Sequence, residues 1–253
     1  MSMTSGEFAE NDIIHSFDKH KLSELPNNLR EFATGLFGPL EEETEFRCTR
    51  VPGYQKPDIS LEAHGITKRV SIKTGNSRIV HSELFSTFYA FLESLDLPSK
   101  HLRTFQRWIS SDGTLDMSGP QKLSAIEKIA AFRPEIEEWN EFIESRKDIQ
   151  GAIFRRAVID GTESSHLSAD AFYHGTASFG TLATTDQILR WLSKKNFRWL
   201  SNLHVGPLVP SPKFRDYVGN VSNAIGDVTI LFRWAGEEQD LPYIRSHYGS
   251  LGK

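Results

Sequence analysis

The sequence contains one cysteine and lacks any apolar run near the roughly 20 residues that a membrane helix needs. Cys48 cannot form an internal disulfide, and thiolate zinc clusters are excluded. Because Cys48 alternates with Phe46 in an expected strand, we interpret it as a buried apolar residue rather than a nucleophile. The first residues also lack the basic region and apolar block of a secretory signal. These absences predict a protein of the reducing cytoplasm without a membrane partner.

An overall excess of positive charge is also absent, because the formal net charge is −4. The distribution of charge is nevertheless uneven. Residues 1–45 hold 10 acidic and 3 basic side chains, whereas residues 46–78 hold 7 basic and 2 acidic ones. Residues 187–215 hold 6 basic side chains and no acidic one. The chain can therefore present basic surfaces despite its acidic total, which keeps nucleic acid among the expected partners.

The alternation of apolar and turn residues predicts an α/β protein with four regions. Residues 1–22 are polar and poorly periodic, and we expect a flexible N-terminal arm there. Residues 23–98 are expected to form a core, and residues 99–165 a helical insertion with an acidic, solvated face. Residues 166–253 return to a mixed pattern that we expect to complete the core.

Within the core, the pattern predicts a helix, three strands and a second helix. The first helix runs from Pro26 to Gly38, and strands are expected over 44–51, 57–64 and 68–73. The short link around Gly65 predicts that the last two strands form a hairpin. The second helix is expected to begin at His81 or Ser82 and to end before residue 98. Farther along, strands are expected over 170–175 and 226–234, a helix after Thr184, and an irregular loop over 206–213.

Three polar side chains on the expected hairpin suggest chemistry. Side chains alternate along a strand, so Ser71 and Lys73 share one face of the third strand. Residues that pair across a hairpin come within about 5 Å, which allows Asp58 and Lys73 to converge at its open end. A surface ion pair contributing about 0–1 kcal/mol is the alternative interpretation.

Phosphodiester hydrolysis is one reaction that such a pair can serve. The reaction needs oxygen ligands for Mg²⁺, which lowers the pKa of a bound water and offsets phosphate charge. A neighbouring lysine can orient or deprotonate the attacking water, or stabilise the developing charge. The Ile72 carbonyl can add a ligand to Asp58, but a second carboxylate is still needed.

Pro57-Asp58, then twelve residues, then Ser71-Ile72-Lys73, with a helix before and after, resembles the PD-(D/E)XK nucleases. This restriction-endonuclease-like superfamily has a mixed-sheet αβββαβ core, and the resemblance covers about residues 25–95. The chain departs from the pattern at Ser71, where most members carry an acid. A subgroup of restriction enzymes has serine there and a glutamate on the following helix, which corresponds here to Glu83. Glu31 and Glu62 are the other candidate acids.

The resemblance implies a Mg²⁺- or Mn²⁺-dependent DNA endonuclease of restriction type that serves in antiviral defence. Asp58, Glu83 and the Ile72 carbonyl would hold the metal, Lys73 would act on water or phosphate, and Ser71 would support the site. By analogy, the protein would form a homo-oligomer, either a dimer or a tetramer.

Basic residues outside the motif are candidates for DNA contact. The candidate residues are Arg78, His81, Lys194, Lys195, Arg198, Lys213 and Arg215. Near Trp191 and Trp199, bases interleave with aromatics, a pattern that suits phosphate contact with base stacking. Amphipathic packing of the tryptophans is the alternative. For His81 the alternative is a helix cap, and for His174 a structural role competes with a functional one.

Two other classes of function remain open. The Ser71 replacement favours a catalytically decayed subunit that binds nucleic acid or assembles with partners while keeping the fold. A plain protein-interaction domain is the third possibility, which the absence of both metal and DNA binding would favour.

Overall fold

The computed structural model describes residues 5–53, 55–75, 78–119, 122–162, 164–197, 201–213 and 228–248. It is a mixed α/β protein, as the sequence predicts. The chain forms two compact units. The first unit comprises residues 1–78, 155–194 and 236–253, and the second comprises residues 79–154 and 195–235. The second unit therefore begins well before the expected insertion at residue 99, and it also includes a stretch near the C-terminal end.

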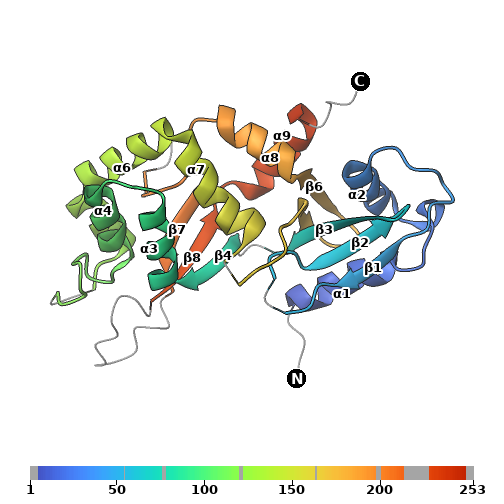
Figure 1. Cartoon of the computed structure of the whole chain (residues 1–253), viewed down its shortest axis with the longest axis horizontal. Coiled ribbons are helices and arrows are strands. Elements are labelled where there is room, and N and C mark those ends of the chain that lie inside the picture. Colours follow the sequence, from blue (N-terminus) through green and yellow to red (C-terminus); the bar gives the residue numbers. More distant parts are fainter. Residues whose placement is uncertain are drawn as a thin grey trace. The chain divides into compact units, whose positions relative to one another are not determined.

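The first unit contains a five-stranded sheet of order β1-β2-β3-β5-β6 (Figure 1). Its strands are β1 (Arg47–Arg50), β2 (Ile59–Ala63), β3 (Ile66–Lys73), β5 (Ala171–Gly175) and β6 (Gly180–Thr184). Only β3 and β5 run parallel, and the other neighbours are antiparallel. The first three strands were expected from the sequence, whereas the pairing of β3 with a strand almost 100 residues later was not.

The expected hairpin around Gly65 is present. Ile59 pairs with Val70 and Ala63 pairs with Ile66, which leaves His64 and Gly65 as the turn. Both turn residues have positive φ, 50° for His64 and 74° for Gly65. Two-residue hairpins favour this conformation because its twist matches that of the strands, and glycine adopts it without steric cost. The turn thereby sets the register that brings Asp58 beside the end of β3.

The expected N-terminal arm is instead a helix, α1 (Ser5–Phe17). Its buried residues Ala9, Ile13 and Phe17 recur every fourth position, which places them on one helical face. Phe17 packs on Phe32 and Phe46 with ring centroids 5.2 and 5.4 Å apart. The prediction of an arm was wrong because polar residues between these three positions concealed the apolar face.

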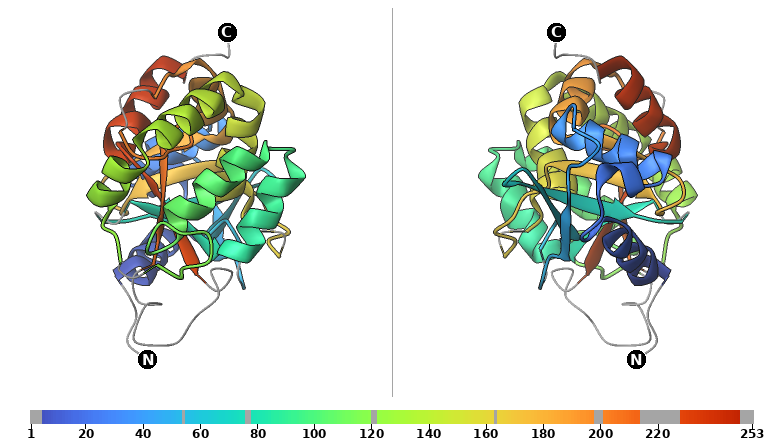
Figure 2. Two further views of the ribbon diagram at one scale, coloured as in Figure 1. Left: turned by 90° about the vertical axis from the view of Figure 1, so that its left-hand side faces the viewer. Right: turned by 90° about the vertical axis from the view of Figure 1, so that its right-hand side faces the viewer.

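Besides the short helical segments Leu22–Glu24 and Arg155–Asp160, three further α-helices lie in the described part of the first unit. They are α2 (Asn27–Phe37), which agrees with the expected first helix, α8 (Thr185–Lys194) and α9 (Glu237–Tyr248). Side chains from α1 and α2 form one core cluster with β1, β2, β3 and β5, and these helices lie against the sheet in Figure 2. Thr184 and Gln187 form the expected reciprocal cap of α8, with hydrogen bonds of 2.9 and 3.4 Å.

The second unit is built on a three-stranded antiparallel sheet of order β4-β8-β7. Its strands are β4 (Ile79–Leu84), β7 (Leu208–Pro212) and β8 (Thr229–Trp234). The sequence predicted a helix beginning at His81 or Ser82, but these residues lie in β4 and the helix α3 begins at Phe85. That boundary was misplaced because pairing with β8, a long-range contact, extends the segment as a strand.

The expected irregular loop over 206–213 contains strand β7. Among the described residues, β7 pairs with no named strand other than β8, so it is an edge strand of the sheet. Pro210 and Pro212 cannot donate backbone hydrogen bonds, and edge strands are where such residues are tolerated. The prolines suggested a loop, although they exclude only a central strand.

Helices pack around this small sheet through aromatic side chains. The helices are α3 (Phe85–Ser94), α4 (Ser99–Ile109), α5 (Ala125–Ala131), α6 (Arg133–Ser145) and α7 (Lys147–Phe154). Phe105 is fully buried, with ring centroids 5.4 Å from Phe88 and 5.5 Å from Trp139. In the part of the chain that the structure describes, no helix is both long and apolar enough to cross a membrane.

Candidate active site

The carboxylate of Asp58 lies at the end of the β2–β3 hairpin in the first unit. Its Oδ2 atom accepts hydrogen bonds from the Ile72 backbone N–H at 2.6 Å and the Ser71 hydroxyl at 3.2 Å. The Lys73 ammonium lies 3.7 Å from the same oxygen. The convergence expected from strand alternation is therefore observed for Asp58, Ser71, Ile72 and Lys73.

The backbone explains why Asp58 occupies this position. Regular pairing of β2 with β3 ends at Ile59 and Val70, and the Asp58 N–H still donates to the Val70 carbonyl at 2.9 Å. Two residues after Val70, the Ile72 N–H donates to the Asp58 carboxylate instead of to a backbone carbonyl of a neighbouring strand. The N–H and C=O of one strand residue point to the same side, so the Ile72 carbonyl points toward Asp58's side. Two oxygen groups are thereby presented at one edge.

The residues around Asp58 differ in exposure. Ser71 is fully buried, whereas the side chains of Lys73 and Asp58 are 28% and 23% exposed. Charged groups that are partly open to solvent can meet a substrate, but the buried Ser71 hydroxyl acts only on the Asp58 carboxylate. Ser71 is therefore a positioning residue in this arrangement.

A second carboxylate in the first unit, Glu10 of α1, interacts electrostatically with this site. Burial and the negative charge of Asp58 raise the pKa of Glu10, while Arg50 and Lys73 oppose the rise. Glu10 also pairs with Arg50 at 2.8 Å, and its side chain is 15% exposed. Two carboxylates that repel each other are an arrangement that a cation stabilises. The sequence interpretation missed Glu10 because it treated residues 1–22 as an arm; the Ala9, Ile13 and Phe17 spacing was the available signal.

The buried acid Glu237 and the half-buried His174 lie near Lys73. Strand pairing places His174 of β5 opposite Lys73, and the His174 Nε2 atom lies 3.0 Å from the Gly75 carbonyl. The His174 Nδ1 atom lies 4.0 Å from Oε1 of Glu237, an acid that is only 1% exposed. Burial raises the pKa of Glu237, and electrostatic interactions with His174 and Lys73 oppose that rise. His174 therefore lies beside the candidate site, where it contacts the Gly75 carbonyl and lies 4.0 Å from Glu237.

Glu83, the acid suggested by the resemblance, lies in β4 of the second unit rather than on a helix. Its carboxylate is buried and its Oε1 atom lies 2.9 Å from His81 Nε2. His81 is in the same strand, so it does not cap a helix. The role of Glu83 as a metal ligand remains a prediction, whereas Glu10 lies in the same unit as Asp58 and interacts with it electrostatically.

The two other candidate acids have different surroundings. Glu31 lies on α2 and forms an exposed ion pair with Arg245 at 2.8 Å, with its side chain 60% exposed. Glu62 pairs in the sheet with Arg47 on one side and Thr67 on the other.

The predicted DNA-contacting residues are distributed over both units. Arg78 and Lys194 belong to the first unit, whereas His81, Lys195 and Lys213 belong to the second. Arg78 has a positive φ of 51° and lies 3.9 Å from Glu238. The predicted residues Arg198 and Arg215, like Trp199, lie outside the described part of the chain.

On α8, the aromatic residue of the predicted basic and aromatic pattern, Trp191, packs in the interior. Trp191 is fully buried, so its ring does not offer a stacking surface. The Lys194 ammonium lies 5.6 Å from the centre of the Tyr248 ring, and an Arg190 nitrogen lies 3.5 Å from the Tyr248 carbonyl. The amphipathic alternative therefore describes Trp191, and phosphate contact by Lys194 and Lys195 remains a prediction.

The oxygen donors of the site suit Mg²⁺, which prefers carboxylate and carbonyl ligands and keeps several waters. Asp58, Glu10 and the Ile72 carbonyl would hold the ion. Among the described residues, no three His, Cys, Asp or Glu side chains form a group that could hold a metal. Such a site would thus be built from two carboxylates and a backbone oxygen, with water completing the shell.

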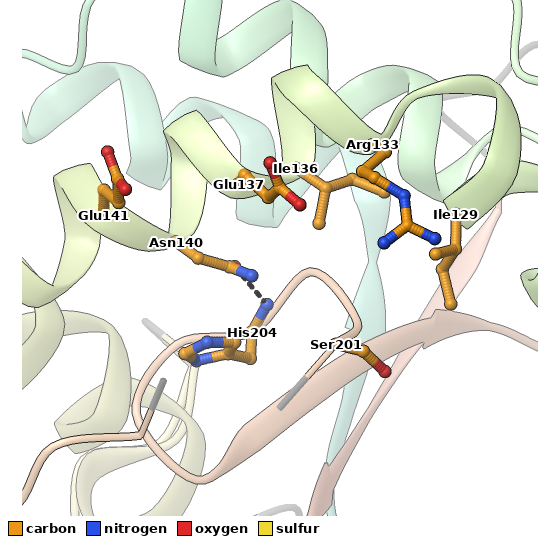
Figure 3. Close-up of a pocket in the computed structure, with 8 residues that line it drawn as sticks. All are labelled: Ile129, Arg133, Ile136, Glu137, Asn140, Glu141, Ser201 and His204. Atoms are coloured by element: carbon orange, nitrogen blue, oxygen red, sulfur yellow. Dashed lines mark hydrogen bonds between the residues drawn. The ribbon is translucent and has the colours of Figure 1, made fainter. Parts of the chain in front are cut away.

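A separate cavity of about 290 Å³ lies in the second unit (Figure 3). Asn140 on α6 accepts a hydrogen bond from the His204 N–H at 3.1 Å and donates one to the Asn202 carbonyl at 3.0 Å. Figure 3 shows Arg133 pointing from the same helix toward the segment that carries Ser201. None of the predicted catalytic residues lines this cavity. The Asn140 amide is used in hydrogen bonds that hold residues 202–204 to α6.

Comparison with known proteins adds no further information about the site. No protein-family model, curated protein or solved structure matches this chain.

Proposed function

We propose that the first unit is a metal-dependent endonuclease that hydrolyses phosphodiester bonds in DNA, with a role of restriction type in antiviral defence. The observation that carries the proposal is the convergence of Asp58, Lys73 and the Ile72 backbone at one sheet edge, at the spacing that resembles the PD-(D/E)XK motif. Glu10 supplies a second carboxylate that responds electrostatically to Asp58.

Each residue has a role that follows from its contacts. Asp58 and Glu10 would hold Mg²⁺ or Mn²⁺ together with the Ile72 carbonyl, and the metal would supply a water of lowered pKa and offset phosphate charge. The Ile72 N–H and the Ser71 hydroxyl orient the Asp58 carboxylate. Lys73 lies beside that carboxylate and orients the attacking water or stabilises the charge that develops on the phosphate. Asp58 also keeps the Lys73 ammonium at the reaction site.

Phosphate contacts outside the site would come from the predicted bases. Arg78 follows β3 in the first unit, and Lys194 lies at the end of α8. Each phosphate contact that is lost should reduce the salt dependence of DNA affinity by about one unit of slope. A dimer or tetramer would bring two such sites to the two strands.

The test is incubation of the full chain with supercoiled plasmid and linear DNA in Mg²⁺ or Mn²⁺, with a chelator control. We expect nicked or linear products that require the metal, and no products from Asp58→Asn. That change preserves an acceptor oxygen for the Ile72 N–H and the Ser71 hydroxyl, so folding is retained. Metal-independent cleavage, or equal cleavage by a folded Asp58→Asn variant, would contradict the proposal.

A second candidate function is a nucleic-acid-binding or assembly subunit with a decayed site. It is favoured by Ser71, a neutral residue at the position where most PD-(D/E)XK nucleases carry an acid. It predicts DNA binding that is unaffected by a chelator, and no Mg²⁺ binding that depends on Asp58. Calorimetric titration of Mg²⁺ into wild-type protein and Asp58→Asn separates the two functions.

A further inference from the structure

A cavity of about 320 Å³ in the second unit has a basic and apolar lining. Trp108 of α4, Pro210 and Pro212 of β7, Leu123 and Val209 contribute its main apolar surfaces. The basic side chains that line it are Lys122, Lys128 and Arg233, and no acidic side chain is among the described residues that form its wall. Its volume is at the lower end of the range of small-molecule sites, about 300–1,000 Å³.

Lys128 places a buried positive charge in this wall. It is 4% exposed, and its ammonium donates hydrogen bonds to the Trp108 carbonyl at 2.7 Å and to the Ser110 carbonyl. These carbonyls belong to the C-terminal end of α4, where helix acceptors need outside partners. An ammonium has three N–H donors, so one remains for another acceptor. Burial lowers the pKa of Lys128 to about 8, and an anion beside it would oppose that effect.

Arg233 adds a second cation from β8. One of its guanidinium nitrogens donates to the Ser211 hydroxyl, which leaves several donors of the planar group for an acceptor. Among the described residues, no carboxylate lies within the 4.0 Å of an ion pair with either Arg233 or Lys128. Lys128 is buried and Arg233 is half-buried, and the charge of Asp112 acts on Lys128 from beyond ion-pair distance. Because buried charges are normally paired, these two cations at one cavity favour an anionic ligand.

We propose that this cavity binds a phosphate monoester that carries a planar ring, such as a nucleoside monophosphate. A phosphate monoester has a charge of about −1.5 to −2 at pH 7, which matches Lys128 and Arg233 together, whereas a carboxylate offsets only one of them. Arginine donates two parallel hydrogen bonds to phosphate oxygens. Trp108 and the two prolines supply apolar surfaces for the ring. The inference does not depend on the proposed nuclease activity of the first unit.

The test is calorimetric titration of the full chain with adenosine monophosphate, adenosine and inorganic phosphate, at constant ionic strength and without divalent metal. Adenosine monophosphate should bind at least about tenfold more tightly than either fragment, because only it occupies both the basic and the apolar surfaces. A 5′-phosphorylated oligonucleotide, titrated beside its unphosphorylated counterpart, separates a nucleic-acid end from a free nucleotide as the source of the phosphate.

Arg233→Met should weaken binding of adenosine monophosphate at least about tenfold, which corresponds to about 1.4 kcal/mol. Arg103→Met is the matched control, since Arg103 is an exposed arginine on α4 that does not line the cavity, and it should bind normally. If Arg233→Met fails to fold, Lys122→Met replaces it, because Lys122 is exposed and lines the cavity. Absence of binding at about 1 mM ligand, equal binding of adenosine, or unchanged affinity in the cavity variants would overturn the proposal.

Discussion

The candidate active site of the first unit and the basic cavity of the second hold their charges in different ways. In the first unit, Asp58, Glu10 and Lys73 act on one another, and two of these side chains are partly exposed at a sheet edge. At the cavity of the second unit, the Lys128 ammonium donates its hydrogen bonds to two carbonyls at the end of α4, and no carboxylate among the described residues lies at ion-pair distance from it. Opposed charges near solvent suit a reaction with a charged substrate, whereas a buried cation held by carbonyls suits structure or the binding of an anion.

The units also differ in how their sheets are formed. The first unit combines a local hairpin with a parallel pair, β3 and β5, whose strands are separated by most of the second unit in sequence. The sheet of the second unit is entirely antiparallel, but its strand β4 pairs with β8 about 150 residues later. Both units therefore close through long-range contacts, and their local segments alone do not define them.

The largest expected effect is on activity in the first unit. Lys73→Met should reduce DNA cleavage at least about a hundredfold, because the ammonium beside Asp58 is lost while the apolar part of the side chain is kept. Metal binding should persist, as measured by Mg²⁺ titration. Lys68→Met is the control, since Lys68 lies on the same strand and contacts Asp170 at 3.5 Å instead. Cleavage at the wild-type rate by folded Lys73→Met would remove Lys73 from the site.

Core substitutions compare the stability of the two units. Phe32→Ala in the first unit and Phe105→Ala in the second each remove a buried ring, and each should cost about 3–5 kcal/mol of unfolding free energy. Hydrogen exchange followed by mass spectrometry should show the larger loss of protection in the unit that carries the change. Equal loss across both units in both variants would show that the two unfold as one.

Substitution of acids separates the candidates for the second metal ligand. Glu10→Gln should weaken Mg²⁺ binding and cleavage about tenfold or more, because a neutral amide removes the negative charge beside Asp58. Glu31→Gln, an exposed acid of the same unit that is paired with Arg245, should behave as wild type. Glu83→Gln is measured in parallel. If it alone loses Mg²⁺ affinity, the ligand is Glu83, as the resemblance implies.

The last prediction concerns the pH dependence of stability. Burial lowers the pKa of Lys128 from 10.5 to about 8, so the unfolded chain binds more protons than the folded one between these values. The contribution of Lys128 to the free energy of unfolding therefore rises with pH across this window, by about 3 kcal/mol at most. Urea unfolding at about pH 7.5 and about pH 9.5 measures the rise, which should be smaller in Lys128→Met. An identical pH dependence in both proteins would assign it to other groups.

Local sequence patterns determined the hairpin and the meeting of Asp58 with Lys73. Alternation along strands and the His64-Gly65 turn are short-range constraints, so residues 57–73 specify that part of the site without the rest of the chain. The same holds for α2 and for the cap of α8. The resemblance to PD-(D/E)XK nucleases rests on these local features.

Tertiary structure alone decided three other features: the position of Glu10, the pairing of β3 with β5, and the division into two units. Glu10 comes within electrostatic range of Asp58 and Lys73 because the apolar face of α1 packs on α2 and the sheet, a contact that polar composition concealed. Residues 79–84 form a strand because β8 supplies its hydrogen-bonding partner, overriding the helical pattern that follows. Long-range pairing depends on which apolar faces fit together, and neither strand periodicity nor motif spacing contains that information.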